Sequence, residues 1–366
     1  MSKVKYLFFF FLLFALSCGE EPGPEDLTGD LEDIPYAPVA VEYKNPPFYP
    51  KIEFPADNAP TEAGIDLGRR LFYDPILSKD STMGCFSCHK QELAFTDGGA
   101  LSLGIDGLPG RRSSMSLIDV GYNYRGLFWD GRASTLEEQA LLPVEDPVEL
   151  HTTWPEIEQK MRRSKTYPEL FRKAFGINDR KKIDKKLVAK AIAQFERTIV
   201  SSGKTKYDLV KLGEDFLDFD ESEGLDMFFD KSTILPDAQC GHCHNDPLFT
   251  SNEYFNNGIS MAQFPDQFID KGRGEFTKVE SDMGKFRAPS LRNIMLTAPY
   301  MHDGSMADIG TVLDHYISGG HPSPGRDPLI TDVKLDAIQR EQIIAFLRTL
   351  TDDKVITDPA LSNPFK

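Results

Sequence analysis

Cysteine is scarce in this chain, which has only five among 366 residues. At that frequency, two copies of one cysteine motif are hard to produce by chance. Basic residues are also few, with 41 Lys and Arg against 57 Asp and Glu. This balance argues against a nucleic-acid-binding protein and suits a soluble protein whose partners, if it has any, are basic.

The sequence also lacks the alternating apolar and polar pattern of half-buried strands over any length comparable to its helical patterns. Apolar residues recur instead at helical spacing, which predicts helices within residues 61–78, 183–202, 222–231, 308–318 and 336–351. The predicted fold class is therefore mainly α.

The first seventeen residues, "MSKVKYLFFFFLLFALS", hold two lysines followed by an apolar run that is too short for an ordinary membrane span. We predict a lipoprotein signal peptide over 1–17, because Cys18 directly follows a small residue at its end. A cleaved soluble signal is the alternative. The mature protein would carry lipid on Cys18 and lie on the periplasmic or cell-surface side. Loss of Lys3 and Lys5 would change its net charge from −16 to −18.

The remaining chain divides into a tether and two domains. Residues 18–50 are rich in proline and acidic residues without periodicity, which predicts a flexible tether. A break near 201–206 separates an N-terminal domain over 51–203 from a C-terminal domain over 204–356. The second half repeats the plan of the first, with a helical segment before each cysteine motif.

Four of the five cysteines lie in two Cys-x-x-Cys-His pentads, "CFSCH" and "CGHCH". Disulfide exchange gives the histidine no role, and zinc would require the two pairs to converge on one ion. A c-type haem uses every position, because each cysteine bonds one vinyl group and the histidine ligates the iron. We predict two covalent haems on Cys85, Cys88, Cys240 and Cys243, with His89 and His244 as iron ligands and His242 as a spacer.

Three further segments carry a family resemblance: "LGRRLFYDPILS", "LFWDGRASTLEEQALLPVEDPVELH" and "FRAPSLRNIMLTAPYMHDGSM". With the pentads, they make the chain resemble the bacterial di-haem cytochrome c peroxidase family, including its MauG-like branch, over residues 56–351. The resemblance implies two cytochrome c-like helical domains with a haem in each and an interface between them. It also implies that the N-terminal haem reacts with peroxide and that the C-terminal haem collects electrons.

The resemblance assigns roles to three residues after the first pentad. Trp129 matches the tryptophan between the two haems, although core packing is its plainer interpretation. Glu149 matches the catalytic glutamate, which would move a proton between the two oxygens of peroxide as their bond breaks. Without the motif, Glu149 would be interpreted as a surface charge. Arg132 is expected to pair with a haem propionate, which suits a guanidinium group.

The loop after the first pentad departs from the family pattern. Members that need reductive activation have a histidine there that caps the first iron, whereas this loop reads "LSLGIDGLPGRR", with Ile105 at the expected position. No histidine lies between His89 and His151. We therefore expect the first haem to be open at rest, with His151 as a remote candidate for a cap.

A second departure concerns the distal ligand of the second haem. The position of the methionine in the peroxidases is Tyr316 here, as in MauG-like members, although Tyr316 also fits the apolar stripe of its helix. A phenolate ligand would lower the reduction potential of the iron relative to a thioether. His302 is expected to support the second haem by hydrogen bonding. Other candidate ligands near in sequence are Met283, Met295, Met301, Met306 and His315.

The resemblance further implies a calcium ion between the domains. The carbonyl positions match Thr297 and Pro299, whereas the asparagine position is Ser113, a poorer oxygen donor. Calcium is therefore a prediction with one weak ligand.

The sequence thus predicts a cytochrome c peroxidase that reduces hydrogen peroxide with electrons from a small cytochrome c or copper protein. Two alternatives stay open: a MauG-like oxidase that modifies a partner protein, and a di-haem electron carrier with both irons six-coordinate. We expect no nucleic-acid partner, and a homodimer is possible.

Overall fold

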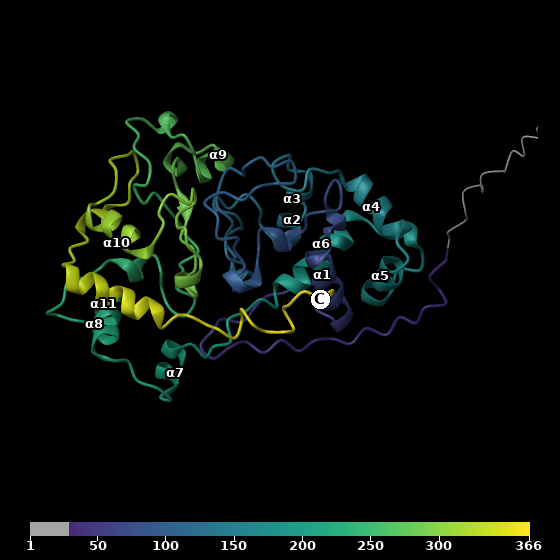
Figure 1. Ribbon diagram of the computed structural model, residues 1–366, viewed down its shortest axis with the longest axis horizontal. Helices are drawn as coiled ribbons and strands as arrows, with labels where there is room; N and C mark the ends of the chain where they lie inside the picture. The colour runs from purple at the N-terminus through teal and green to yellow at the C-terminus, as the bar shows by residue number, and fades with distance from the viewer. Residues whose placement is uncertain (1–28) are drawn as a thin grey trace, which may run out of the picture.

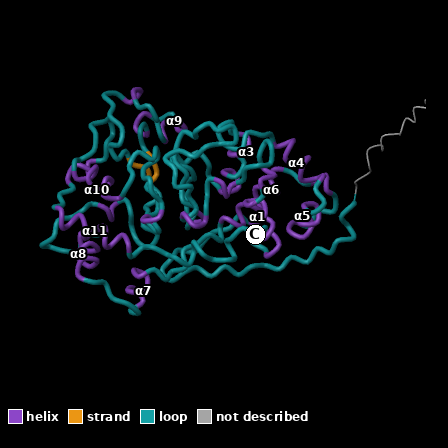
Figure 2. Tube along the Cα trace, in the orientation of Figure 1, coloured by secondary structure: helices purple, strands orange, loops and turns teal. Residues whose placement is uncertain are grey.

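A computed structural model describes residues 29–366, except the side chains of residues 331 and 332. The signal-peptide and Cys18 predictions lie outside these residues. The regular structure is mainly helical, as predicted (Figure 1), with one small two-stranded sheet (Figure 2). None of the helices in this described part combines the length and apolar character needed to span a bilayer.

The α-helices are α1 (Glu62–Tyr73), α2 (Leu136–Gln139), α3 (Leu142–Glu145), α4 (Trp154–Arg163), α5 (Tyr167–Phe175), α6 (Lys185–Glu196), α7 (Lys206–Leu212), α8 (Phe219–Phe228), α9 (Arg273–Thr277), α10 (Ile309–Ile317) and α11 (Ala337–Arg348). Strands β1 (Tyr254–Phe255) and β2 (Phe286–Arg287) are antiparallel, with Tyr254 opposite Arg287. Short 3₁₀ helices occupy Pro75–Leu77, Cys85–Ser87, Gln91–Leu93, Val120–Tyr122, Arg180–Lys182, Cys240–His242, Pro265–Gln267, Glu280–Asp282, Ile294–Leu296 and Pro328–Asp332.

The five predicted helices are present, with ends set by local chemistry. Helix α1 ends at Tyr73, earlier than the predicted segment, because Pro75 follows and restricts the residue before it. Helix α8 begins three residues earlier than predicted, because Asp218 and Glu221 form a capping box at its start.

Each half of the chain contains a helix crossing that requires glycine. A Cβ atom on Gly68 of α1 would lie 1.9 Å from the carbonyl oxygen of Ala191 in α6. A Cβ atom on Gly224 of α8 would lie 2.0 Å from the carbonyl oxygen of Gln342 in α11. A larger residue at either position would push its helix pair apart. The helix before each pentad is thus fixed in the same way against the last helix of its half.

The buried apolar side chains form separate clusters on the two sides of residue 200. Two clusters draw on residues 67–199, and a third draws on residues 207–350. There are two exceptions: Val355 and Leu361 pack in a cluster of the N-terminal half, and Leu248 packs with Tyr49, Ile52 and Tyr122 in a fourth, smaller cluster.

The C-terminal segment after α11 returns to the first half, as the yellow trace in Figure 1 shows. The hydroxyl of Tyr73 donates a hydrogen bond of 2.7 Å to the carbonyl oxygen of Leu361. The side-chain nitrogen of Gln91 donates to the carbonyl oxygens of Val355 and Asp358, at 3.1 and 2.9 Å. These bonds hold the end of the chain beside the first pentad.

The segment from residue 29 to residue 50 lies along the folded body (Figure 1). Leu31 is buried, and its backbone nitrogen donates to the carbonyl oxygen of Asn178 at 3.1 Å. Arg180 forms an ion pair with Asp30. This part of the predicted tether is therefore held by contacts, and residues 18–28 lie outside the described range.

Candidate active site

Both pentad histidines are oriented by backbone carbonyl groups. The Nδ1 atom of His89 lies 2.9 Å from the carbonyl oxygen of Phe95. The Nδ1 atom of His244 lies 3.1 Å from the carbonyl oxygens of Phe249 and Pro289. A carbonyl oxygen only accepts, so Nδ1 carries the proton in each ring and the Nε2 lone pair is left for a metal.

Burial also lowers the pKa of both imidazoles, which keeps them in the neutral form that binds iron. The four pentad cysteines form no disulfide, and among residues 29–366 no group of three or more His, Cys, Asp or Glu converges as a metal site. Zinc shared by the two pairs therefore has no support. The free thiols and oriented histidines suit one covalent haem in each cavity described below.

The first cavity lies beside Cys85, Cys88 and His89, and Glu149 is among its lining residues. Burial is the main cause that raises the pKa of Glu149 to about 7, and the nearby charge of Asp146 raises it further, while Arg132 lowers it. A carboxyl group with a pKa near neutrality can both take up and release a proton.

Two residues to which the sequence assigns no role line the same cavity. Gln139 of α2 lines the cavity together with Glu149. Glu196 of α6 is 4% exposed, its Oε2 atom has no hydrogen-bond partner, and burial raises its pKa to about 8. Unlike Glu149, which can release its proton near pH 7, Glu196 is therefore mostly protonated at neutral pH.

The loop that lacks the capping histidine packs directly on the segment that carries Glu149. A Cβ atom on Gly104 would lie 2.1 Å from the carbonyl oxygen of Val148, and the nitrogen of Ile105 donates to the carbonyl oxygen of Glu149 at 2.8 Å. His151, the remote candidate for a cap, pairs with Asp106 in a partly exposed position and is not among the cavity-lining residues. Neither Ile105 nor His151 faces the cavity beside His89.

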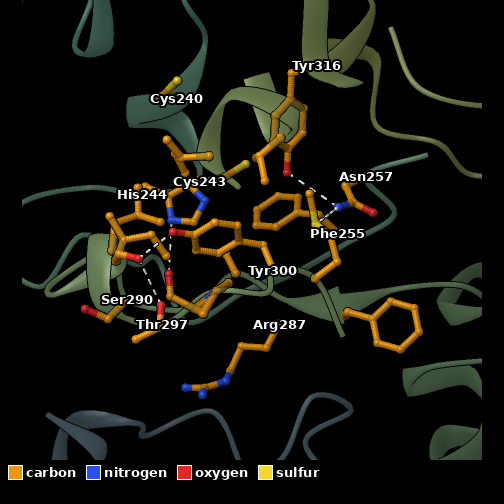
Figure 3. Close-up of a pocket in the computed structure, with 18 of the residues that line it drawn as sticks. Cys240, Cys243, His244, Phe255, Asn257, Arg287, Ser290, Thr297, Tyr300 and Tyr316 are labelled. Atoms are coloured by element: carbon orange, nitrogen blue, oxygen red, sulfur yellow. Dashed lines mark hydrogen bonds between the residues drawn. The ribbon is translucent and has the colours of Figure 1, made fainter. Parts of the chain in front are cut away.

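The second cavity lies beside Cys240, Cys243 and His244, and Tyr316 projects from α10 into it (Figure 3). The side-chain nitrogen of Asn257 lies 3.4 Å from the hydroxyl of Tyr316 and 3.3 Å from the sulfur of Met301. One amide group thus contacts the predicted distal ligand and one of its alternatives. Burial raises the pKa of Tyr316 to about 12, so the free phenol is protonated at neutral pH.

The other candidate ligands have other surroundings. Met306 is buried in the apolar cluster of the C-terminal half, with Met295 packed against it. Met283 packs on Gly274. His315 Nε2 donates a hydrogen bond of 2.9 Å to the carbonyl oxygen of Asn257, so this nitrogen carries the proton. Of the alternatives, only Met301 lines the cavity with Tyr316.

Trp129 lines both cavities. Its indole nitrogen donates a hydrogen bond of 2.9 Å to the carbonyl oxygen of Ser113. Its own carbonyl oxygen accepts a hydrogen bond of 2.8 Å from the nitrogen of Arg287 in β2. Trp129 is therefore fixed by a residue from each half of the chain.

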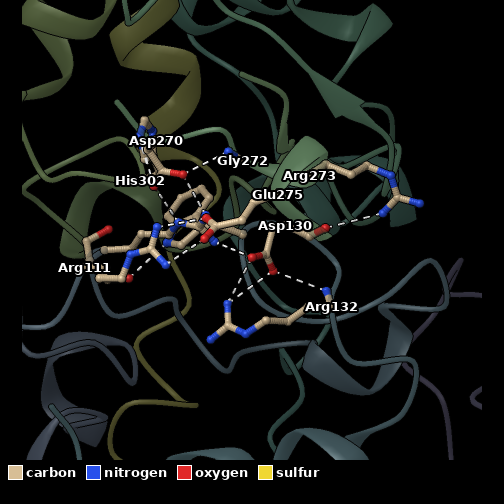
Figure 4. A network of polar contacts seen from close by, with 11 residues as sticks. Arg111, Asp130, Arg132, Asp270, Gly272, Arg273, Glu275 and His302 are labelled. Carbon is tan, nitrogen blue, oxygen red and sulfur yellow. Dashed lines mark hydrogen bonds and ion pairs between the residues drawn. The ribbon is translucent and has the colours of Figure 1, made fainter. Parts of the chain in front are cut away.

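Arg132 already has a carboxylate partner, which the sequence did not predict. Its Nη1 atom lies 3.2 Å from both carboxylate oxygens of Asp130. Asp130 also pairs with Arg112, which in turn contacts Asp270 of the C-terminal half at 2.7 Å (Figure 4). The predicted pairing of Arg132 with a propionate remains a prediction, and this network links the two halves.

The three residues of the predicted calcium site, Ser113, Thr297 and Pro299, all line the second cavity. The hydroxyl of Ser113 donates to the carbonyl oxygen of Met301 at 2.8 Å. His302 lines the same cavity and stacks on Phe286 with ring centroids 3.6 Å apart. The calcium ion and the support from His302 remain predictions.

Comparison with known proteins gives the family. The family described as "Di-haem cytochrome c peroxidase" matches residues 62–215. The chain is 31% identical to the methylamine utilization protein MauG of Methylorubrum extorquens, over 93% of this chain and 92% of that protein. It is 33% identical to the cytochrome c551 peroxidase of Nitrosomonas europaea, over 87% of this chain and 88% of that protein.

A solved structure is also similar. It is that of a MauG-like protein associated with microbial copper homeostasis, which is 34% identical, with a TM-score of 0.81 over 89% of this chain and all of that chain. Relatives with both peroxidase and MauG names thus align over most of the chain, and the two pentads supply the residues for two haems. The chain belongs to the di-haem cytochrome c peroxidase family.

Proposed function

We propose that the protein is a peroxidase that reduces hydrogen peroxide to water with electrons from a small cytochrome c or copper protein. The observation that carries the proposal is Glu149, a buried carboxyl group with a pKa near 7 in the cavity beside His89. The residues that line this cavity include no histidine other than His89. The cavity therefore has a proton-transfer group and no second imidazole to close it.

In this proposal, haem supplies the iron at which peroxide is reduced and through which electrons pass. Glu149 in its carboxylate form takes one proton from hydrogen peroxide and returns it to the departing oxygen as the O–O bond breaks. Gln139 can donate a hydrogen bond to a small polar substrate in the same cavity.

The route for electrons runs from the second cavity to the first. Trp129 supports it, because it borders both cavities and is hydrogen-bonded on both sides. Its ring would shorten the gap between the two haems. Two electrons and two protons are needed for each peroxide that becomes two waters, so the donor protein must deliver two electrons per cycle.

The decisive experiment mixes the purified di-haem protein with peroxide and a reduced small cytochrome c, with and without pre-reduction. Rapid donor oxidation is expected, and Glu149→Gln should lower kcat by roughly 10²–10⁴-fold. Glu145→Gln, an exposed neighbour on α3, is the matched control and should retain the wild-type rate. If the wild-type protein oxidises no donor under either condition, the proposed peroxidase function is wrong.

A MauG-like oxidase is the second candidate, because Tyr316 projects into the second cavity and relatives named MauG align over most of the chain. This enzyme would use oxidising equivalents from peroxide to modify a side chain of a partner protein. Peroxide consumption without donor turnover, together with a mass change in a co-purified protein, would favour it. A pure electron carrier would show no high-spin ferric signal in the oxidised protein.

We also propose a membrane-anchored location on the periplasmic or cell-surface side, through lipid on Cys18. The support is the sequence of the first eighteen residues alone. Membrane fractionation of the wild type and of Cys18→Ser tests it: the wild type should sediment with membranes, and the variant should not.

A further inference from the structure

Among residues 29–366, the buried arginines other than Arg287 have a carboxylate partner. Arg112 pairs with Asp130 and Asp270, at 2.7 Å each. Two more buried pairs are Arg292 with Asp208, at 2.8 Å, and Arg197 with Glu137, at 2.7 Å. Arg287 is 5% exposed and has no carboxylate within ion-pair distance in the described chain.

The contacts of Arg287 are weak for a buried cation. Its Nη1 atom lies 3.4 Å from the amide oxygen of Asn252, and its Nη2 atom lies 3.9 Å from the sulfur of Met115. Its Nε atom has no hydrogen-bond partner. Burial lowers the pKa of Arg287 to about 10, which still leaves it charged at neutral pH. A buried charge without a counter-ion is costly, so an anion is expected beside it.

The place of Arg287 indicates where that anion comes from. Arg287 lines both haem cavities, and its backbone is hydrogen-bonded to Trp129 between them. In Figure 3 its side chain leaves the strand that borders the second cavity and extends toward the N-terminal half. The guanidinium group of Arg287 thus belongs to a residue that borders both candidate haem sites.

A c-type haem carries two carboxylates on the edge opposite its two thioether bonds. The cysteines hold one edge of each haem at the pentads, so the carboxylate edges are free to face the interior where Arg287 lies. A guanidinium has five N–H donors in a fork and can bind two carboxylates at once. The free Nε and the weakly occupied Nη atoms match that requirement.

We infer that Arg287 is the shared counter-ion of the two haems and binds one carboxylate from each cavity. It is a positioning residue: it fixes the facing edges of both haems on the two sides of Trp129. Its positive charge stabilises the reduced form of each iron relative to the oxidised form, so it raises both reduction potentials. The inference depends on the two haems of the proposed function and does not depend on the reaction with peroxide.

The test is a spectroelectrochemical titration of the matured di-haem protein, which needs neither peroxide nor an electron donor. Arg287→Gln should shift the equilibrium of each haem at least tenfold toward oxidised iron. For one electron, this shift lowers each reduction potential by about 59 mV. Arg125→Gln is the matched control, because Arg125 is exposed, pairs with Glu253 and lines neither cavity. It should leave both potentials unchanged.

A second variant keeps the inference testable if Arg287→Gln fails to mature with two haems. Arg287→Lys retains the charge but not the fork, and a single ammonium is expected to serve one carboxylate well and the other poorly. One potential should then fall clearly more than the other. Unchanged potentials in both haems, or a shift confined to the same single haem in Arg287→Gln and Arg287→Lys, would overturn the shared role while leaving the peroxidase intact.

Discussion

The phenolic oxygen of Tyr316 lies 3.4 Å from the side-chain nitrogen of Asn257. The same nitrogen lies 3.3 Å from the sulfur of Met301, so a phenol and a thioether meet at one amide in the second cavity. These two donors have opposite effects on an iron: an anionic oxygen favours the ferric state, whereas a thioether raises the potential.

Substitution of Tyr316 tests which donor reaches the iron. Tyr316→Phe should change the spectrum of the second haem and raise its reduction potential by on the order of 0.1 V, within the range of about 0.8 V that axial ligands span. Met301→Leu should change neither. The reverse result, with Met301→Leu altering the spectrum and Tyr316→Phe leaving it intact, would assign the thioether as the ligand.

The pH dependence of peroxide reduction should report Glu149. The carboxylate form accepts the proton, so kcat/KM should be high above pH 7 and should fall as the pH drops below about 7. Two neighbouring residues should shift the pH of this fall in opposite directions. Asp146→Asn removes a charge that raises the pKa of Glu149, so kcat/KM should fall at a lower pH, whereas Arg132→Gln removes a charge that lowers this pKa, so kcat/KM should fall at a higher pH. If both variants show the wild-type pH dependence, the fall is caused by another group.

Glu196 should make stability depend on pH. Burial raises its pKa from 4.5 to about 8 in the folded protein. Between these values the unfolded chain loses the proton and the folded chain keeps it, so this residue lowers the free energy of unfolding as the pH rises from 4.5 to 8. Glu196→Gln should be more stable than the wild type at pH 8, by on the order of 4 kcal/mol, and equally stable at pH 4.

Denaturant titrations of the haem-loaded protein at several pH values measure this difference. The exposed Glu145→Gln is the control and should follow the wild type throughout. Equal stability of Glu196→Gln and wild type at pH 8 would show that a bound partner, such as water, satisfies the carboxyl group.

The two tryptophans of the chain form a matched pair for testing electron transfer. Trp129 and Trp154 each donate a hydrogen bond to a backbone carbonyl, at 2.9 and 3.2 Å, but only Trp129 lines the cavities. Each substitution by Phe should cost about 1 kcal/mol from the lost hydrogen bond. Only Trp129→Phe should slow the oxidation of the donor, as measured by stopped-flow absorption. An equal slowing in both variants would indicate a loss of structure instead.

The sequence predicts best what depends on near neighbours. The pentads are local, because five adjacent positions define the attachment of a haem, and the major helices follow from apolar spacing. Helices α4 and α5 were not predicted, although both contain a proline in the first turn, and Trp154, Ile157 and Met161 form an apolar face at helical spacing. These signals are present in the sequence.

What the sequence could not show is which polar groups lack partners. Both Arg132 and Arg287 lie in the family motifs in the sequence, yet Asp130 pairs with Arg132, whereas no carboxylate of the described residues pairs with Arg287. Likewise, Glu196 lies on a helix among residues that the sequence predicts to be buried. Only the packing around Glu196 leaves its Oε2 atom without a hydrogen-bond partner. Burial without a partner depends on residues far apart in the chain.

The return of the C-terminal segment to the first half limits how this protein can be dissected. Val355 and Leu361 are 3% and 4% exposed in a cluster whose other fully buried side chains all belong to residues 72–199. A fragment that ends near residue 203 would lack both side chains and the hydrogen bonds to Tyr73 and Gln91. The first half is therefore not a portable module, and an affinity tag or truncation at the C-terminus would act on the surroundings of Cys85, at the opposite end of the sequence.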